Sequence, residues 1–288
     1  MSLSGKIVLL TGASMGIGEA IARDLANHGA DLILFSRSED KLSKLTKELT
    51  QSNPSVRVIH RAVDVGDFEA VDAAVESSVN ELGAIDVLIN GVGTTPFDIV
   101  HAVRYVSDVF EQAGIALGAP NAFYNLKVSD IQIMNSTNVN GPMFVTHAVL
   151  NRGMLASKQG VIMNITSVTG LEVPPFPGEA VYHASKACQE AFTNALRNEL
   201  IGTNIKVLAL RPGCVATNFH SQRVGHDKEQ YDAFFEGYTP LTPDDIAQAA
   251  VYMLNQPLNV SIKALDVVPS AQRSLAVFDR RWSERNGQ

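Results

Sequence analysis

Cysteine, long apolar runs and excess positive charge are all scarce in this chain. Its 288 residues include two cysteines, Cys188 and Cys214, which form neither a disulfide framework nor a CxxC pair. No run of about eighteen apolar residues is present to cross a bilayer. The first residues lack the basic and apolar regions of a secretory signal. These features predict a cytoplasmic protein with no membrane partner.

Charge and histidine placement disfavour two further classes of function. The formal net charge of −7 argues against nucleic acid or an anionic membrane as the main partner. The seven histidines show no metal-ligand spacing, so we expect no metal site. The composition, with 45% hydrophobic and 18% charged residues, is that of a globular protein with ample core material.

Strand and helix patterns alternate along most of the sequence, which predicts an α/β fold with one doubly wound parallel sheet of about seven strands. We expect a single domain over residues 1–288. Ser38 and Asp67 are predicted to cap helices, Pro243 to begin one, and Ser129 with Gln132 forms a capping-box pattern. The predicted strands are 7–10, 31–35, 56–62, 85–89, 161–166, 205–210 and 265–268.

Two segments interrupt this alternation. Residues 95–127 are irregular, although Ile99, Val103, Val106 and Phe110 are spaced like one face of a helix. Residues 216–240 are irregular and rich in aromatic side chains. Both segments fall between the regular elements, where binding loops are commonly found.

A glycine-rich turn follows the first predicted strand and opens a helix. A phosphate group needs backbone N–H groups at a helix N-terminus, and glycine lets the chain approach it closely. Gly12, Gly16 and Gly18 supply such a turn. Its place between a strand and a helix predicts a dinucleotide site.

The end of the second predicted strand indicates which dinucleotide is bound. A carboxylate at this position favours NAD, whereas arginine accommodates a 2′-phosphate. The chain carries Ser36, a donor to phosphate, and Arg37, which pairs with phosphate or stacks on adenine. We therefore predict a preference for NADP(H) over NAD(H). Glu39 and Asp40 follow closely and favour the other choice if the register shifts.

Tyr182 and Lys186 form a candidate acid–base pair. They are four residues apart in a predicted helix, so they share one face. The pKa of a free tyrosine is about 10, too high for efficient proton transfer at neutral pH. A neighbouring ammonium group favours the phenolate and lowers that pKa.

Taken in order, these motifs resemble the short-chain dehydrogenase/reductase family across roughly residues 5 to 270. The resemblance implies a Rossmann-like fold and narrows to NADP-dependent 3-hydroxy acid dehydrogenases and carbonyl reductases. Asn90-Gly91-Val92-Gly93 departs from the usual family motif at two positions. The matching motifs are Thr11-x-x-x-Gly16-x-Gly18, Asp64-Val65, Asn138 to Gly141, Asn164 to Ser167, Tyr182-x-x-x-Lys186 and Pro212-Gly213 with Thr217.

The resemblance implies a role for each site residue. Tyr182 would protonate the carbonyl oxygen, Ser167 would polarise it, and Lys186 would bind the nicotinamide ribose. Asn138 would hold a water that links Lys186 to solvent. The cofactor contacts that it implies are Gly12, Ser14, Met15, Gly16, Ile17, Gly18, Ser36, Arg37, Asp64, Val65, Asn90, Gly91, Tyr182, Lys186, Pro212, Gly213, Val215 and Thr217.

Two departures from the family bear on substrate. The segment between Ser167 and Tyr182 is longer than usual, and the extra length falls in a proline-rich loop. The interval between Asn90 and Asn138 is also longer, which places an insertion at about 95–127. That insertion is a substrate lid, an oligomer contact or a surface elaboration. Residues 216–240 stand where the family has a mobile substrate loop, although their aromatic side chains also suit packing over the sheet edge.

We therefore expect an NADPH-dependent carbonyl reductase, reversible as an alcohol dehydrogenase, that acts on a small or medium organic ketone. One alternative is a pathway-specific ketoreductase for a bulky substrate. A second is a non-redox scaffold, sensor or cyclase that only binds the cofactor. Family analogy implies a homodimer or homotetramer.

Overall fold

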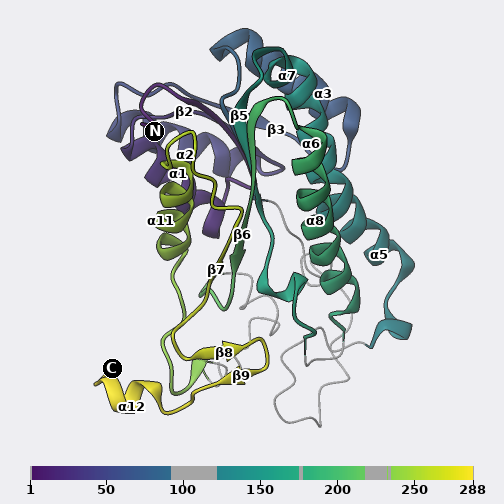
Figure 1. Cartoon of the computed structure of the whole chain (residues 1–288), viewed down its shortest axis with the longest axis vertical. Helices are drawn as coiled ribbons and strands as arrows, with labels where there is room; N and C mark the ends of the chain where they lie inside the picture. Colours follow the sequence, from purple (N-terminus) through teal and green to yellow (C-terminus); the bar gives the residue numbers. More distant parts are fainter. Residues whose placement is uncertain (1, 92–121, 175–177, 218–231, 233–234, 288) are drawn as a thin grey trace.

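The computed structural model describes residues 2–91, 122–174, 178–217, 232 and 235–287. Figure 1 shows one central sheet with helices on both faces, as predicted. The expected helix face at Ile99 to Phe110, the insertion around it and most of the 216–240 loop lie outside the described residues. No helix in the described ranges is long and apolar enough to span a membrane.

Seven parallel strands form the sheet in the order β3-β2-β1-β4-β5-β6-β7, which confirms the predicted Rossmann-like fold. Their runs of aliphatic side chains suit strands that are covered on both faces. Two strands begin two residues later than predicted, at Val58 and Val87. The strands are β1 (Ile7–Thr11), β2 (Asp31–Ser36), β3 (Val58–Ala62), β4 (Val87–Asn90), β5 (Gln159–Ile165), β6 (Asn204–Pro212) and β7 (Ala264–Val267).

Helices cover each face of the sheet and create two separate cores. Alternate residues of a strand point to opposite faces, so Val8 and Leu10 join one core while Ile7 and Leu9 join the other. The first core includes α1 (Gly16–Asn27), α2 (Glu39–Ser52) and α11 (Pro243–Leu254). The second includes α3 (Phe68–Leu82), α6 (Gly141–Val149) and α8 (Ala180–Glu199).

The first residues of the helices can be compared with the N-caps predicted from the sequence. The side chain of Asp67 accepts a hydrogen bond from the Ala70 N–H at 3.0 Å, as predicted. Ser38 precedes α2, but its side chain makes no capping bond. The predicted capping box at Ser129 is wrong: α5 (Val128–Asn135) begins two residues earlier than that box requires, with Lys127 at its N-cap. Because Ser129 already lies within the first turn, its side chain donates to Asp130 instead.

A small C-terminal unit, which the polar sequence after Ser270 did not predict, follows β7. It consists of β8 (Gln272–Ser274), β9 (Val277–Phe278) and α12 (Trp282–Asn286). The first two strands form an antiparallel hairpin, drawn below the sheet in Figure 1. The Gln272 side chain accepts a hydrogen bond from the Cys214 N–H at 3.0 Å, which ties this hairpin to the segment after β6.

Candidate active site

The candidate site lies at the carboxyl ends of the strands, where the strand order reverses. β1 pairs with both β2 and β4, and Thr11 is the register partner of Asn90. Ligands of open α/β sheets bind in the crevice at such a switch point. The Thr11 hydroxyl accepts a hydrogen bond from the Gly91 N–H at 3.1 Å, and a Cβ on Gly91 would lie 2.7 Å from the Thr11 carbonyl oxygen. Glycine is therefore required where the two strand ends meet.

The turn between β1 and α1 has the shape of a phosphate cradle. Gly12 and Gly16 have φ angles of 70° and 56°, a region that side chains disfavour. A Cβ on Gly18 would collide with the Gly12 carbonyl. Met15, at the N-cap of α1, provides no side-chain capping bond. The first turn of α1 thus suits an anionic ligand, and these residues fit the diphosphate of a dinucleotide.

Ser36 and Ser14 join the end of β2 to the glycine turn. The Ser36 hydroxyl donates to the Ser14 hydroxyl at 2.7 Å and accepts from the Ser38 N–H at 3.3 Å. Arg37 is exposed beside them. The predicted 2′-phosphate residues therefore border the same turn that would hold the diphosphate.

The predicted adenine pair divides between two environments. Asp64 is exposed, and its carboxylate accepts a hydrogen bond from the Gly66 N–H at 2.9 Å. Val65 is buried in the core, and its Cγ2 would lie 2.6 Å from a Cβ on Gly141. The carboxylate is therefore available at the surface, whereas the valine side chain mainly packs.

Asn90 anchors a chain of buried polar side chains behind the site. Its Nδ2 donates to the Thr146 hydroxyl at 3.1 Å and to Asn164 Oδ1 at 2.8 Å, and Asn164 donates onward to the Thr193 hydroxyl at 2.7 Å. These bonds connect β4, β5, α6 and α8. Among the described side chains, Asn90 Oδ1 is a buried atom with no hydrogen-bond partner.

Lys186 and Tyr182 lie together on α8, as their spacing predicted. The Lys186 ammonium is 5.9 Å from the centroid of the Tyr182 ring. It donates to the Ile165 carbonyl at 3.1 Å and to Gln189 Oε1 at 3.1 Å. Burial lowers the pKa of Lys186 to about 8, against the opposing charge of Glu190. The ammonium is thus fixed beside the phenol, and its pKa lies closer to neutral pH than that of an exposed lysine.

Ser167 follows β5 and is held at the ends of two strands. Its hydroxyl accepts from the Thr169 N–H at 3.1 Å and donates to the Pro212 carbonyl at 3.5 Å. The first bond caps the short helix Val168–Gly170. This places Ser167 next to the Pro212-Gly213 segment that follows β6.

Asn138 is buried in a π-helical turn, Ser136–Asn140, between α5 and α6. Such turns are rare and occur often at functional sites. Its side-chain amide donates to the Ser185 hydroxyl at 3.2 Å, and Ser185 donates to the Tyr182 carbonyl at 2.7 Å. These bonds attach the turn that carries Asn138 to the turn of α8 that carries Tyr182 and Lys186.

The segment after β6 extends from the nicotinamide end of the predicted site to the glycine turn. The Gly213 N–H donates to the Val267 carbonyl at 2.8 Å. Val215 is buried and bridges to Leu241. Thr217 Cγ2 would lie 3.7 Å from a Cβ on Gly16. The predicted cofactor loop and the predicted phosphate turn therefore lie side by side.

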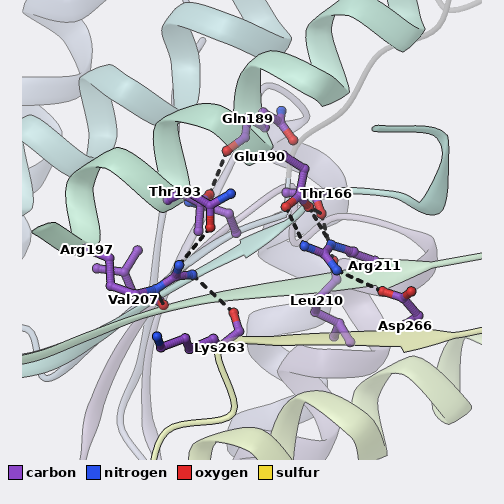
Figure 2. A network of polar contacts seen from close by, with 12 residues as sticks. Thr166, Gln189, Glu190, Thr193, Arg197, Val207, Leu210, Arg211, Lys263 and Asp266 are labelled. Atoms are coloured by element: carbon purple, nitrogen blue, oxygen red, sulfur yellow. Dashed lines mark hydrogen bonds and ion pairs between the residues drawn. The ribbon is translucent and has the colours of Figure 1, made fainter. Parts of the chain in front are cut away.

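Sequence reasoning missed the polar residues on the turn of α8 after Lys186. Glu190 forms an ion pair with Arg211 at 2.8 Å and accepts from the Thr166 hydroxyl, as Figure 2 shows. Gln189 accepts from Lys186 and donates to the Asn138 carbonyl. Their spacing of three and four residues from Lys186 is the sequence signal that could have found them.

Cys214 is inert in this structure. It is buried beside Tyr238, with Sγ 3.5 Å from the phenol oxygen. Burial raises the pKa of the Cys214 thiol to about 12, so the reactive thiolate is suppressed. In the described part of the chain, no group of three potential ligands could hold a metal ion.

Comparisons with known proteins identify the family. The model for short chain dehydrogenase matches residues 6–228. Sulfoacetaldehyde reductase 2 of Chromohalobacter salexigens is 35% identical over 266 residues, which cover 92% of this chain and 95% of that protein. NADP-dependent 3-hydroxy acid dehydrogenase of Schizosaccharomyces pombe is 35% identical over 271 residues, covering 94% and 95%.

A solved structure agrees with these relatives. The closed form of serine dehydrogenase complexed with NADP+ has a TM-score of 0.77 and 30% identity, covering 95% of this chain and 98% of that one. The chain belongs to the short-chain dehydrogenase family, which confirms the predicted family and the predicted class, an oxidoreductase.

Proposed function

We propose that this protein is an NADP(H)-dependent carbonyl reductase that interconverts a ketone or aldehyde with its alcohol. The observation that carries the proposal is the fixed Lys186 ammonium beside the Tyr182 ring. A phenol is a weak acid in water, and an adjacent buried cation stabilises the phenolate that proton donation leaves behind.

The positions of the protein side chains support a role for each of them. Tyr182 gives its proton to the carbonyl oxygen, and Ser167 donates a hydrogen bond to the same oxygen. To do so, the Ser167 hydroxyl turns from the Pro212 carbonyl, a long bond of 3.5 Å, toward the substrate. Lys186 keeps the phenol acidic, and Asn138 holds the helix turn behind it. The cofactor, when bound, supplies a hydride to the carbonyl carbon.

The preference for NADP(H) is supported by this chain and by its relatives. The Schizosaccharomyces pombe relative is NADP-dependent by name, and serine dehydrogenase was solved with NADP+. Here Arg37 is exposed next to Ser36 and the glycine turn. Arginine offers two parallel N–H groups to the 2′-phosphate that distinguishes NADP from NAD.

The substrate is a small or medium organic carbonyl compound or alcohol. The named relatives act on a 3-hydroxy acid, on serine and on sulfoacetaldehyde. These names set the first compounds to assay. A homodimer or homotetramer through the helices that bear Asn138 and Tyr182 is part of this proposal, measurable by light scattering of the purified protein. The cytoplasmic location stays a prediction from sequence.

The test is an absorbance assay at the NADPH band with a panel of ketones, diketones, sulfoacetaldehyde, 3-hydroxy acids and serine. We expect at least one compound to be turned over, with higher kcat/KM for the NADP(H) pair than for NAD(H). Equal efficiency with both cofactors would contradict the cofactor assignment. Tight NADPH binding with no turnover of any compound would favour the cofactor-binding scaffold instead.

A further inference from the structure

We propose that Gln189 is a positioning residue that links Lys186 to the Asn138 carbonyl where the family resemblance expects a water. The proposal rests on the function proposed above, because it assigns Gln189 through its effect on Lys186. Gln189 is buried, with 3% of its surface exposed. It lies one turn after Lys186 on the same face of α8.

Both ends of the Gln189 amide are engaged. Its Oε1 accepts from the Lys186 ammonium at 3.1 Å, and its Nε2 donates to the Asn138 carbonyl at 2.6 Å. The two bonds also fix which end of the amide is oxygen and which is nitrogen, since only the oxygen accepts and only the nitrogen donates. The side chain therefore serves as a specific connector between an ammonium group and a carbonyl.

The Asn138 carbonyl lies where the helix is irregular. Pro142, four positions later, has no N–H and cannot make the regular α-helical bond to this carbonyl. The Gln189 amide donates to it and thereby attaches the π-helical turn to α8.

The same amide orients the Lys186 ammonium. Lysine has three N–H donors, and two of them are held by the Ile165 carbonyl and Gln189 Oε1. In the described part of the chain, the ionisable or charged groups facing Lys186 are Tyr182 and Glu190, both on α8, and Glu190 is paired with Arg211 of β6. From β5, the neutral Ile165 carbonyl accepts from Lys186, whereas the Asn138 carbonyl of the turn Ser136–Asn140 accepts from Gln189. Gln189 is thus a neutral acceptor that favours the charged form of Lys186.

An amide differs from water in one chemical respect. A water that bridges the same groups would accept a proton on one side and release one on the other. The Gln189 amide offers its oxygen to Lys186 and its N–H to Asn138, and its neutral amide form carries no proton between them. The link therefore holds Lys186 in place without serving as a proton path.

The test is an NMR titration of the Lys186 side chain in the full-length protein, labelled with ¹³C at lysine Cε. The Lys186 signal is assigned by its loss in Lys186→Met. Gln189→Met has similar length but neither bonding atom, and it should lower the titration midpoint by about one pH unit, since a hydrogen bond to a charged group is lost. Gln189→Glu places a carboxylate against the ammonium and should raise the midpoint.

Thr193→Val is the matched control. The Thr193 hydroxyl donates to the Gln189 backbone carbonyl at 2.7 Å and accepts from Asn164, so this change removes buried bonds on the same helix without touching Lys186. It should lower thermal stability and leave the Lys186 midpoint in place. A midpoint in Gln189→Met equal to that of the wild type, or shifts of the same sign in Gln189→Met and Gln189→Glu, would overturn the proposal.

The titration separates this inference from the proposed function, because it needs no turnover. If Gln189→Met does not fold, the proposal is tested by Gln189→Glu alone. A Lys186 titration midpoint that does not rise in Gln189→Glu then overturns it. If the midpoints move as expected but the carbonyl panel gives no turnover, the proposed function fails and the role of Gln189 in orienting Lys186 stands.

Discussion

Two successive turns of α8 differ sharply in what they contact. The first, from Tyr182 to Lys186, presents a half-buried phenol at the carboxyl end of the sheet. The second, from Gln189 to Thr193, carries buried polar side chains that bond to β5, β6 and the Asn138 turn. The Lys186 ammonium can stay buried away from water because the next turn of α8 supplies polar partners for it.

This comparison predicts that changes in the two turns affect different properties of the protein. Changes in the first turn should reduce turnover and leave folding nearly intact. Changes in the second should reduce stability before they reduce binding of the cofactor. The predictions below test that difference, beginning with the largest expected effect.

Tyr182→Phe should have the largest effect on activity. It removes the proton donor and leaves the ring in place, so kcat should fall by about ten-thousandfold, the upper range for a positioned general acid. The dissociation constant of NADPH should stay nearly unchanged. Steady-state kinetics with the best compound of the panel and a fluorescence titration with NADPH check both parts. A kcat within tenfold of the wild-type value would show that Tyr182 is not the proton donor.

Glu190→Ala should have the largest effect on stability. It leaves the Arg211 guanidinium, with a side chain only 16% exposed, without its buried partner. Breaking a buried ion pair by removing one member costs about 3–5 kcal/mol of unfolding free energy. Urea unfolding of the wild type and the variant measures this loss of unfolding free energy.

The stability supplied by Glu190 should also depend on pH. Burial opposes ionisation of this carboxyl, yet hydrogen bonds from Arg211 and Thr166 hold its pKa below the ordinary value. Its contribution is therefore present above the unfolded value of about 4.3 and lost as the pH falls through the folded pKa. The difference between wild type and Glu190→Ala should shrink in acid. A difference independent of pH down to full protonation would contradict the ion-pair account.

Carbonyl reduction should decline as the pH rises past about 8. Burial lowers the pKa of Lys186 to about 8, so the ammonium loses its proton there. The neutral amine no longer stabilises the phenolate of Tyr182, and each further pH unit should reduce kcat by about tenfold while Lys186 controls it. A pH profile measured with saturating NADPH checks this. A constant kcat through pH 9.5 would mean that the charge on Lys186 does not control the step.

Arg152→Ala should have the smallest effect and serves as the surface counterpart of Glu190→Ala. Arg152 also bridges two carboxylates, Asp72 and Glu76, each at 2.6 Å, but all three side chains are at least 31% exposed. Exposed ion pairs are screened by solvent and contribute little to stability. Urea unfolding under the same conditions should show a loss much smaller than that of Glu190→Ala. A loss equal to that of Glu190→Ala would show that burial does not determine how much each ion-pair network stabilises the fold.

The sequence predicted the sheet well because its signals are local. Runs such as Ile7 to Leu10, the glycine turn after them and the cap at Asp67 each act within a few residues. The pair Tyr182 and Lys186 was found for the same reason, since helical spacing alone places them together. The C-terminal hairpin was not predicted because a tertiary contact, the Gln272 bond to Cys214, helps to hold it in place. The error at Ser129 is local, since the helix already begins at Val128.

The buried connections behind the site could not be read in the same way. Glu190 and Arg211 are 21 residues apart, and Asn138 is 51 residues from Gln189. No local pattern joins such residues; only the packing of α8 against β6 and the Asn138 turn brings them into contact. A proline four positions after Asn138 shows locally only that the regular α-helical bond to its carbonyl is missing.

The central claim is that this site transfers a hydride from NADPH to a carbonyl carbon. The most direct measurement uses NADPH carrying deuterium at C4 of the nicotinamide and mass spectrometry of the alcohol formed from the best compound of the panel. We predict one deuterium on the carbinol carbon for each labelled NADPH consumed. Oxidation of NADPH without deuterium in the alcohol, after correction for the face of the ring that is labelled, would contradict the account.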